Sequence, residues 1–118
     1  MIDPELVPVV AARFKALAEP ARLVILAALH QGERSVNELT AATGRAQPNV
    51  SQHLSSLARS GLVAARREGN RVFYRIADPY IARICEAVCD SLAARVQEDR
   101  KWTARLRRGR RPGARSRG

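Results

Sequence analysis

The sequence is poor in the residues on which most enzymes and metal sites depend. Its 118 residues include two cysteines, two histidines and one methionine, and aromatic residues make up only 4%. It contains no constellation of paired carboxylates, no glycine-rich phosphate loop and no set of metal ligands at regular spacing. These absences argue against an enzyme. With so few aromatics, a core must be built from Leu, Val, Ile and Ala, which favours helices.

Long hydrophobic runs are missing as well. No segment reaches the roughly 18 apolar residues of a transmembrane helix. The N-terminus is acidic, with Asp3 and Glu5, and does not resemble the basic start of a signal peptide. We therefore expect a cytoplasmic protein with no membrane partner. In that compartment the two cysteines, Cys85 and Cys89, should stay reduced.

Positive charge is unevenly distributed along the chain. The formal net charge is +10, but residues 1–99 carry twelve basic and eleven acidic residues. Residues 100–118 carry nine basic residues and no acidic one. We expect one folded domain over residues 1–99 and a basic, disordered tail over residues 100–118, although Trp102 and Leu106 could extend the last helix by a turn or two. The arginines of the tail favour contact with nucleic acid, whereas the nearly neutral domain gives no such indication.

Hydrophobic periodicity predicts two helices in the first third of the chain. Residues 4–18 form an amphipathic segment, with apolar residues such as Val10 and Phe14 on one stripe. Pro20 opens a second segment, residues 20–30, as proline does at the first positions of a helix. This segment is apolar on nearly every side, which is typical of a central buried helix.

Two short helices joined by a tight turn should follow. Ser35 and Glu38 form a capping box at the start of the first, and Gly44 ends it. Gln47-Pro48 opens the second, and Gly61 stops it. Two short helices joined by a glycine-containing turn predict a helix-turn-helix.

After Gly61 the spacing of apolar residues changes from the 3.6-residue period of a helix to the two-residue period of a strand. Residues 62–68 and 71–77 alternate like strands around Gly69-Asn70, which predicts a β-hairpin. Asp78-Pro79 then begins a last amphipathic helix, roughly residues 79–98. The expected fold class is mainly α with a β-hairpin wing, in the order α-α-α-α-β-β-α.

Three stretches resemble one family of regulators: FKALAEPARLVILAAL, SVNELTAATGRAQPNVSQHLSSLARSGLV and RREGNRVFYRI. They look like the ArsR/SmtB family of bacterial dimeric transcriptional repressors, over about residues 10–98. The most specific parts are Gln47-Pro48, Ser51-x-His53-Leu54 and Gly61-Leu62-Val63. The resemblance implies a winged helix-turn-helix homodimer, paired through its first and last helices, that represses transcription from a palindromic double-stranded DNA operator.

Uncharged polar side chains on the second short helix fit a helix that reads base edges. Gln and Asn can bond adenine at two points, and Ser can donate or accept. Taken alone, such residues only cap or solvate a surface helix, but the preceding helix and the hairpin favour DNA reading. For His53 a packed, hydrogen-bonded side chain is an equally good interpretation. The candidate DNA contacts are Gln47, Asn49, Ser51, Gln52 and His53 on the helix, and Arg66, Arg67, Asn70 and Arg71 on the wing.

The ligand sites that the resemblance suggests are mostly missing. The three cysteine positions of arsenic-sensing members are Ser35, Asn37 and Thr40 here. Of the zinc-site positions on the last helix, only Asp78 matches. No cofactor is therefore certain.

What remains is Cys85 and Cys89, which their four-residue spacing places on one face of the last helix. One interpretation treats them as small hydrophobic residues of the dimer interface. The other makes them a thiol sensor for a soft metal, arsenite, reactive sulfur or an oxidant, with any disulfide crossing the dimer. A different class of function stays open: a constitutive or non-specific nucleic-acid-binding protein driven by the basic tail, with structural cysteines.

Overall fold

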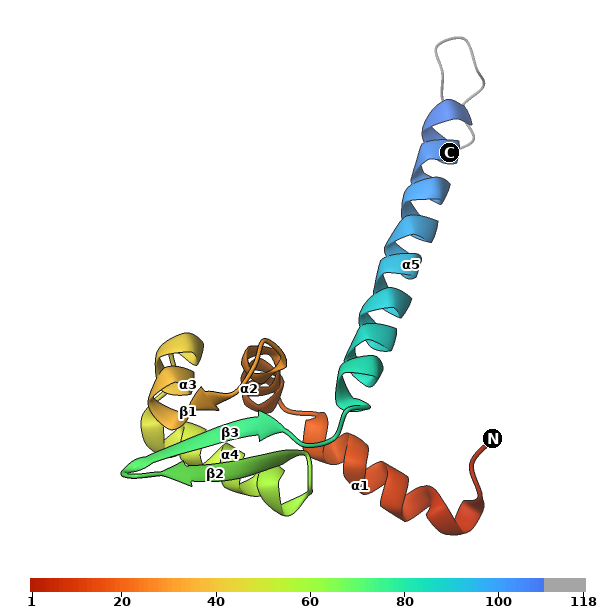
Figure 1. Ribbon diagram of the computed structural model, residues 1–118. Coiled ribbons are helices and arrows are strands. Elements are labelled where there is room, and N and C mark those ends of the chain that lie inside the picture. Colours follow the sequence, from red (N-terminus) through yellow and green to blue (C-terminus); the bar gives the residue numbers. More distant parts are fainter. Residues whose placement is uncertain (110–118) are drawn as a thin grey trace. The chain divides into compact units, whose positions relative to one another are not determined.

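The computed structural model describes residues 1–109 and divides into two compact units, residues 1–79 and a second unit that begins at Tyr80 (Figure 1). The predicted order of helices and hairpin strands is confirmed, and a short 3-10 turn and one additional strand are present. The elements are η1 (Pro4–Leu6), α1 (Val7–Leu17), α2 (Pro20–His30), β1 (Arg34–Ser35), α3 (Val36–Thr43), α4 (Gln47–Arg59), β2 (Val63–Glu68), β3 (Arg71–Ile76) and α5 (Ile81–Gly109).

Local signals in the sequence set the ends of the helix-turn-helix. The Ser35 hydroxyl accepts from the Glu38 amide at 3.1 Å, and the Ser35 amide donates to the Glu38 carboxylate at 3.0 Å. This capping box starts α3. Gly44 ends α3 with φ of 69°, a left-handed conformation that costs glycine least. The chain can therefore turn at once into α4.

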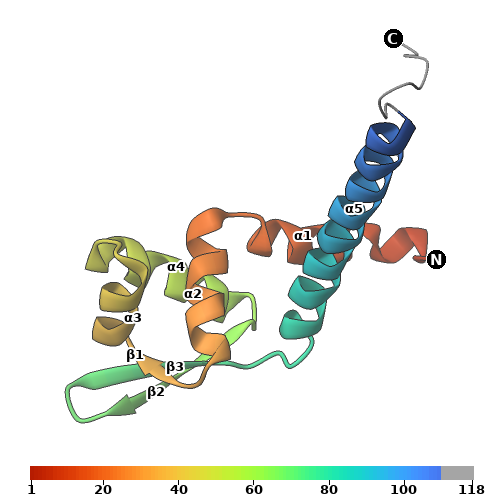
Figure 2. The same cartoon turned by 90° about the horizontal axis from the view of Figure 1, so that it is seen from above.

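The core of the first unit lies where α2, α3 and α4 meet the sheet (Figure 2). Ile25 from α2, Leu39 from α3, and Val50 and Leu54 from α4 are fully buried. Burying each such side chain contributes about 1.5–3 kcal/mol. The inner side of α4 is thus held firmly, and its opposite side is left to solvent.

The wing is the β2-β3 hairpin, and it belongs to a three-stranded antiparallel sheet of order β1-β3-β2. Gly69 has φ of 61° at the turn, while Asn70 does not have a positive φ. A positive φ at the first central residue alone matches a type II′ turn, whose twist suits a hairpin. Strand β1, which the sequence did not predict, pairs Arg34 and Ser35 with β3.

Helix α1 buries little of its apolar surface within one chain. Leu17 is its one buried residue, and Phe14, on the predicted stripe, is 54% exposed. Val7 and Val9 are also exposed. An apolar surface of this kind is typical of a helix that meets a partner.

Helix α5 is longer than predicted. It continues to Gly109, so the expectation of a disordered tail beginning at residue 100 is wrong for residues 100–109. The remainder of the predicted tail, residues 110–118, lies outside the described residues. No helix within residues 1–109 combines the length and the apolar character needed to cross a membrane.

Candidate nucleic-acid interface

The outward side of α4 is polar and almost free of charge. Gln52, Ser55 and Arg59 follow the apolar Pro48 at helical spacing on the side opposite the buried Val50, Leu54 and Leu57. Gln52 and Ser55 are exposed in the middle of this line, and its one charged side chain, Arg59, stands at the C-terminal end. A face of short hydrogen-bonding side chains can approach base edges without binding phosphate everywhere along a duplex.

The other predicted residues of α4 lie at different depths. Gln47 is exposed at the first position of the helix, and Ser51 is half-buried beside the outward line. Asn49 is half-buried, and its Oδ1 atom is buried without a hydrogen-bond partner within residues 1–109. Gln52 is therefore the predicted residue best placed to touch a ligand in front of the helix.

His53 is turned toward the protein. Its side chain is 11% exposed, and its Nδ1 atom accepts a hydrogen bond of 3.3 Å from Arg22 Nε. Its Nε2 atom lies 3.8 Å from the Glu19 carboxylate. Arg22 also contacts Glu19 at 3.4 Å and donates to the Ala16 carbonyl at 3.1 Å. These contacts favour the packed interpretation of His53, which joins α4 to the start of α2.

On the wing, Arg66 is engaged by carboxylates of its own chain. Its guanidinium lies 2.7 Å from Glu33 and 2.6 Å from Glu68, and it stands 4.7 Å from the centroid of the Phe73 ring. The hydrogen bond to Glu33 is the main cause that raises the pKa of Arg66, and the same bond lowers the pKa of Glu33. Arg66 therefore fixes β2 to the segment before β1.

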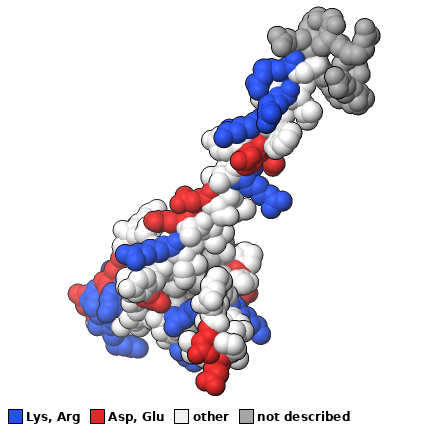
Figure 3. Space-filling model, turned by 90° about the vertical axis from the view of Figure 1, so that its right-hand side faces the viewer, with Lys and Arg blue, Asp and Glu red and all other residues white. Residues whose placement is uncertain are grey.

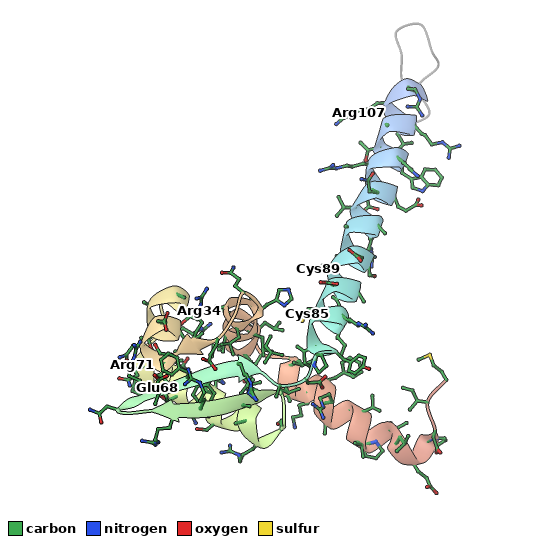
Figure 4. All side chains as sticks on the ribbon, viewed as in Figure 1. Arg34, Glu68, Arg71, Cys85, Cys89 and Arg107 are labelled. Atoms are coloured by element: carbon green, nitrogen blue, oxygen red, sulfur yellow. The ribbon has the colours of Figure 1, made fainter. Side chains whose placement is uncertain are left out.

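Arg71 is similarly placed at the start of β3. One of its terminal nitrogens lies 3.4 Å from the Ser35 hydroxyl and 3.9 Å from Glu38, and its guanidinium is 4.9 Å from the Phe73 ring. In the register of the β2-β3 hairpin, Arg71 stands opposite Glu68 across the turn of the wing (Figure 4). The pKa of Glu38 is lowered chiefly by its hydrogen bond from the Ser35 backbone. Arg71 thus connects the wing to the cap of α3.

Arg67 and Asn70 are the predicted wing residues whose side chains are left for an external ligand. Both are exposed, and Arg67 has no ion-pair partner within residues 1–109. Successive strand residues point to opposite faces, so Arg67 points away from the Arg66 carboxylate cluster.

Sequence reasoning did not include two residues of the α4 face, Ser55 and Arg59. A helical-spacing argument from Gln52 would have found both, because they lie three and seven residues further along the same side. Arg45, in the turn before α4, is a second basic side chain close to the face in sequence, and it too lacks an ion pair within residues 1–109.

The two cysteines lie one turn apart on α5 (Figure 4). Both are free thiols; Cys85 is half-buried and Cys89 is exposed. Within residues 1–109 no group of three or more His, Cys, Asp or Glu could hold a metal ion. One chain therefore supplies two sulfur ligands at most, and a soft metal would need further ligands from another molecule.

Comparison with known proteins gives a consistent result. The model of the family described as bacterial regulatory protein, arsR family, matches residues 19–65. A helix-turn-helix-type transcriptional regulator of Mycobacterium tuberculosis is 49% identical over 88 residues, which cover 74% of this chain and 76% of that protein. A biofilm growth-associated repressor of Agrobacterium fabrum is 47% identical over 79 residues, which cover 67% of this chain and 68% of that protein.

A solved structure extends the comparison to the fold. The solution structure of a homodimeric winged helix-turn-helix DNA-binding domain from Mycobacterium bovis, a possible ArsR-family transcriptional regulator, is 40% identical and superposes with a TM-score of 0.71. The match covers 83% of this chain and 93% of that chain. The predicted winged helix-turn-helix fold is confirmed.

Proposed function

Because this chain belongs to the ArsR/SmtB family of bacterial transcriptional regulators, which are DNA-binding proteins and not enzymes, we propose that it is a sequence-specific repressor. It acts in the cytoplasm and binds a palindromic DNA operator as a homodimer. The observation that carries this proposal is the uncharged polar face of α4, whose inner side is fully buried and whose outer side presents Gln52. The major groove of B-DNA admits one α-helix.

The contacts described above divide the candidate residues into two groups. Gln47, Ser51 and Gln52 of α4 are the base-reading group, with Asn49 at its edge. Arg67 and Asn70 of the wing contact the sugar-phosphate backbone beside it. Arg66, Arg71 and His53 have partners within the protein and hold the wing and α4 in position.

The experiment that tests this function is selection of binding sites from a pool of random duplex DNA. We expect enrichment of an inverted repeat, because a two-fold dimer presents two identical helices to the duplex. The two half-sites should lie about 10–10.5 base pairs, or a multiple of that, apart. A selected pool with no shared motif would instead favour charge-driven coating of nucleic acid.

Two adjacent wing arginines provide a matched test of the backbone contact. Arg67→Ala should weaken binding to all DNA sequences alike and reduce the slope of log K against log salt by about 0.9, since one phosphate contact is lost. Arg66→Ala should change that slope less, because its charge is already opposed by Glu33 and Glu68. Fluorescence anisotropy at several salt concentrations measures both slopes. Equal slopes for Arg67→Ala and the parent protein would remove Arg67 from the interface.

The homodimer is proposed through α1 and α5. Both helices carry exposed apolar side chains, including Phe14 on α1 and Val88 and Leu92 on α5. The related M. bovis domain is a homodimer. Exposed apolar side chains on two helices would favour aggregation of a monomer. A two-fold dimer covers them and matches a palindromic operator.

We also propose that a thiol-directed signal releases the protein from DNA. Cys85 is half-buried and Cys89 is exposed on the helix assigned to the dimer, so capture of a soft metal or arsenite, or modification by reactive sulfur or an oxidant, would alter the packing of α5. A change in that packing would alter the spacing of the two α4 helices of the dimer. Coupling between such sites typically amounts to about 1–3 kcal/mol.

The thiol proposal has a direct test in a Cys85→Ser/Cys89→Ser variant. The variant should bind operator DNA like the reduced parent protein and should lose the response to the signal. Titration of operator complexes with arsenite, zinc, cadmium, polysulfide and peroxide measures both properties, and each single variant shows whether one thiol is enough. If none of these agents weakens binding by the parent protein, the cysteines are packing residues of α5.

A further inference from the structure

The C-terminal end of α5 carries positive charge on one side of the helix. Residues 100–109 include five basic residues and no acidic one. At 3.6 residues per turn the five lie within a sector of about 160°, and Trp102 and Leu106 lie on the opposite side. Figure 3 shows Lys and Arg side chains gathered toward this end of α5. We call this surface the basic face; it consists of the exposed residues Arg100, Lys101, Arg105, Arg107 and Arg108.

Carboxylates of the chain leave most of the basic face unneutralised. Arg105 lies 5.2 Å from the centroid of the Trp102 ring, a contact that orients the guanidinium and keeps its charge. Four of the five residues make no ion pair within residues 1–109: Arg100, Lys101, Arg105 and Arg107. This differs from the wing, where Arg66 is held between two carboxylates. The charge of the basic face is therefore available to an external anion.

The stability of the helix itself does not account for this arrangement. Basic residues stabilise a helix through its dipole only in the last turn, which contains Arg107 and Arg108. Arg100 and Lys101 lie further from the end. Lys101 and Arg105 are four residues apart, and a like-charge pair at that spacing destabilises a helix. An anion bound along the basic face would remove this repulsion, so the segment suits a polyanionic partner.

The density of charge on the basic face matches that of duplex DNA. From Arg100 to Arg108 the five charges extend over about 12 Å of the helix axis, and double-stranded DNA carries about seven phosphate charges in the same length. We propose that the basic face of α5 binds the phosphates of duplex DNA and forms a second contact, separate from α4 and the wing. This contact reads no bases, since guanidinium and ammonium groups bind phosphate in any sequence. The inference rests on the proposed DNA-binding function and adds to it a sequence-independent site.

A membrane surface with anionic lipids offers negative charge as well, but the segment fits it less well. A helix that lies on a membrane buries a broad apolar face between the lipid headgroups and the acyl chains. In residues 100–109 the large apolar side chains are Trp102 and Leu106, which are 58% and 63% exposed. Two side chains make a small apolar face beside five positive charges. The balance of charge and apolar surface therefore favours DNA.

Replacing all five residues of the basic face by glutamine tests the second contact in the full-length chain. Glutamine removes the charge and keeps a high helix propensity, so helix content and sedimentation should match those of the parent protein. The variant should bind operator and random duplex more weakly by a similar factor, roughly tenfold or more at physiological salt. The slope of log K against log salt should fall by up to about 4.5 per chain, for five lost phosphate contacts. Fluorescence anisotropy at several salt concentrations measures both quantities.

Two single variants provide a matched comparison that does not depend on the folding of the fivefold variant. Arg107→Gln and Arg83→Gln each remove one arginine from an exposed position on α5. Arg107→Gln should lower the slope by about 0.9 per chain, and Arg83→Gln, outside the basic face, should leave it unchanged. Arg107→Lys keeps the charge and should restore the slope of the parent protein.

The outcomes separate this inference from the proposed function. The preference of the parent protein for the selected inverted repeat tests the proposed function, and the fivefold variant should retain that preference. Parent slopes in both the fivefold variant and Arg107→Gln would overturn the second contact and leave the proposed function intact. If, in addition, vesicles of phosphatidylserine and phosphatidylcholine bind the parent protein but not the fivefold variant, the basic face belongs to a membrane surface. Weaker binding to the operator alone would also contradict a contact with phosphates.

Discussion

A Val88→Glu variant should be monomeric and should bind operator DNA no more tightly than random DNA. Val88 is exposed in one chain and belongs to the apolar surface that the dimer is proposed to cover. A carboxylate buried there without a partner costs roughly 3–5 kcal/mol, which corresponds to a dimer weaker by a factor of about 10² to 10³ or more. A monomer reaches one half-site only, so the specific affinity should disappear together with the dimer.

Sedimentation and operator binding, measured on the same preparation, check this expectation. Ala93→Glu is the matched control, because Ala93 is exposed on a different side of α5 and receives the same new charge. The control should remain dimeric and bind normally. If Val88→Glu also remains dimeric, the interface lies elsewhere on the molecule.

Gln52→Ala should weaken binding to the operator by about 1–3 kcal/mol, while binding to random DNA stays nearly unchanged. Gln52 is exposed opposite the buried side of α4, where an amide can donate to and accept from one base at the same time. The neutral side chain contributes little to the non-specific, phosphate-driven part of the affinity. Loss of this side chain should therefore reduce the preference of the protein for its operator over random DNA.

Gln97→Ala provides the control for Gln52→Ala, since it removes the same side chain from an exposed position on α5. Thermal unfolding of both variants should match the parent protein, because neither residue is buried. Equal losses by Gln52→Ala on operator and random DNA would mean that Gln52 does not read a base.

The sequence predicted those parts of the fold that local chemistry determines. Pro20 at the start of α2, the Ser35–Glu38 capping box and Gly69 in the wing turn each act within a few residues. Their signals are visible without knowledge of the rest of the chain. The helix-turn-helix and the hairpin followed from them.

The features that were missed depend on contacts distant in sequence. Strand β1 exists because Arg34 and Ser35 pair with β3. It is two residues long, which is too short for a pattern of alternating apolar residues to predict it. The ion pair of Arg66 was not predicted, because its carboxylate partner Glu33 comes from a loop 33 residues earlier in the chain. The full length of α5 was underestimated, because Trp102 and Leu106 continue its apolar spacing through a basic segment and the helix reaches Gly109.

Sequence-specific binding is best measured by the specificity ratio of the parent protein. It is the ratio of the dissociation constants for random duplex and for the selected inverted repeat, measured at several salt concentrations. A base-reading dimer should give a ratio of at least about 10³ at physiological salt, with Gln52→Ala lowering it and Gln97→Ala leaving it unchanged. A ratio near one at every salt concentration would contradict the account and indicate a protein that binds nucleic acid through charge alone.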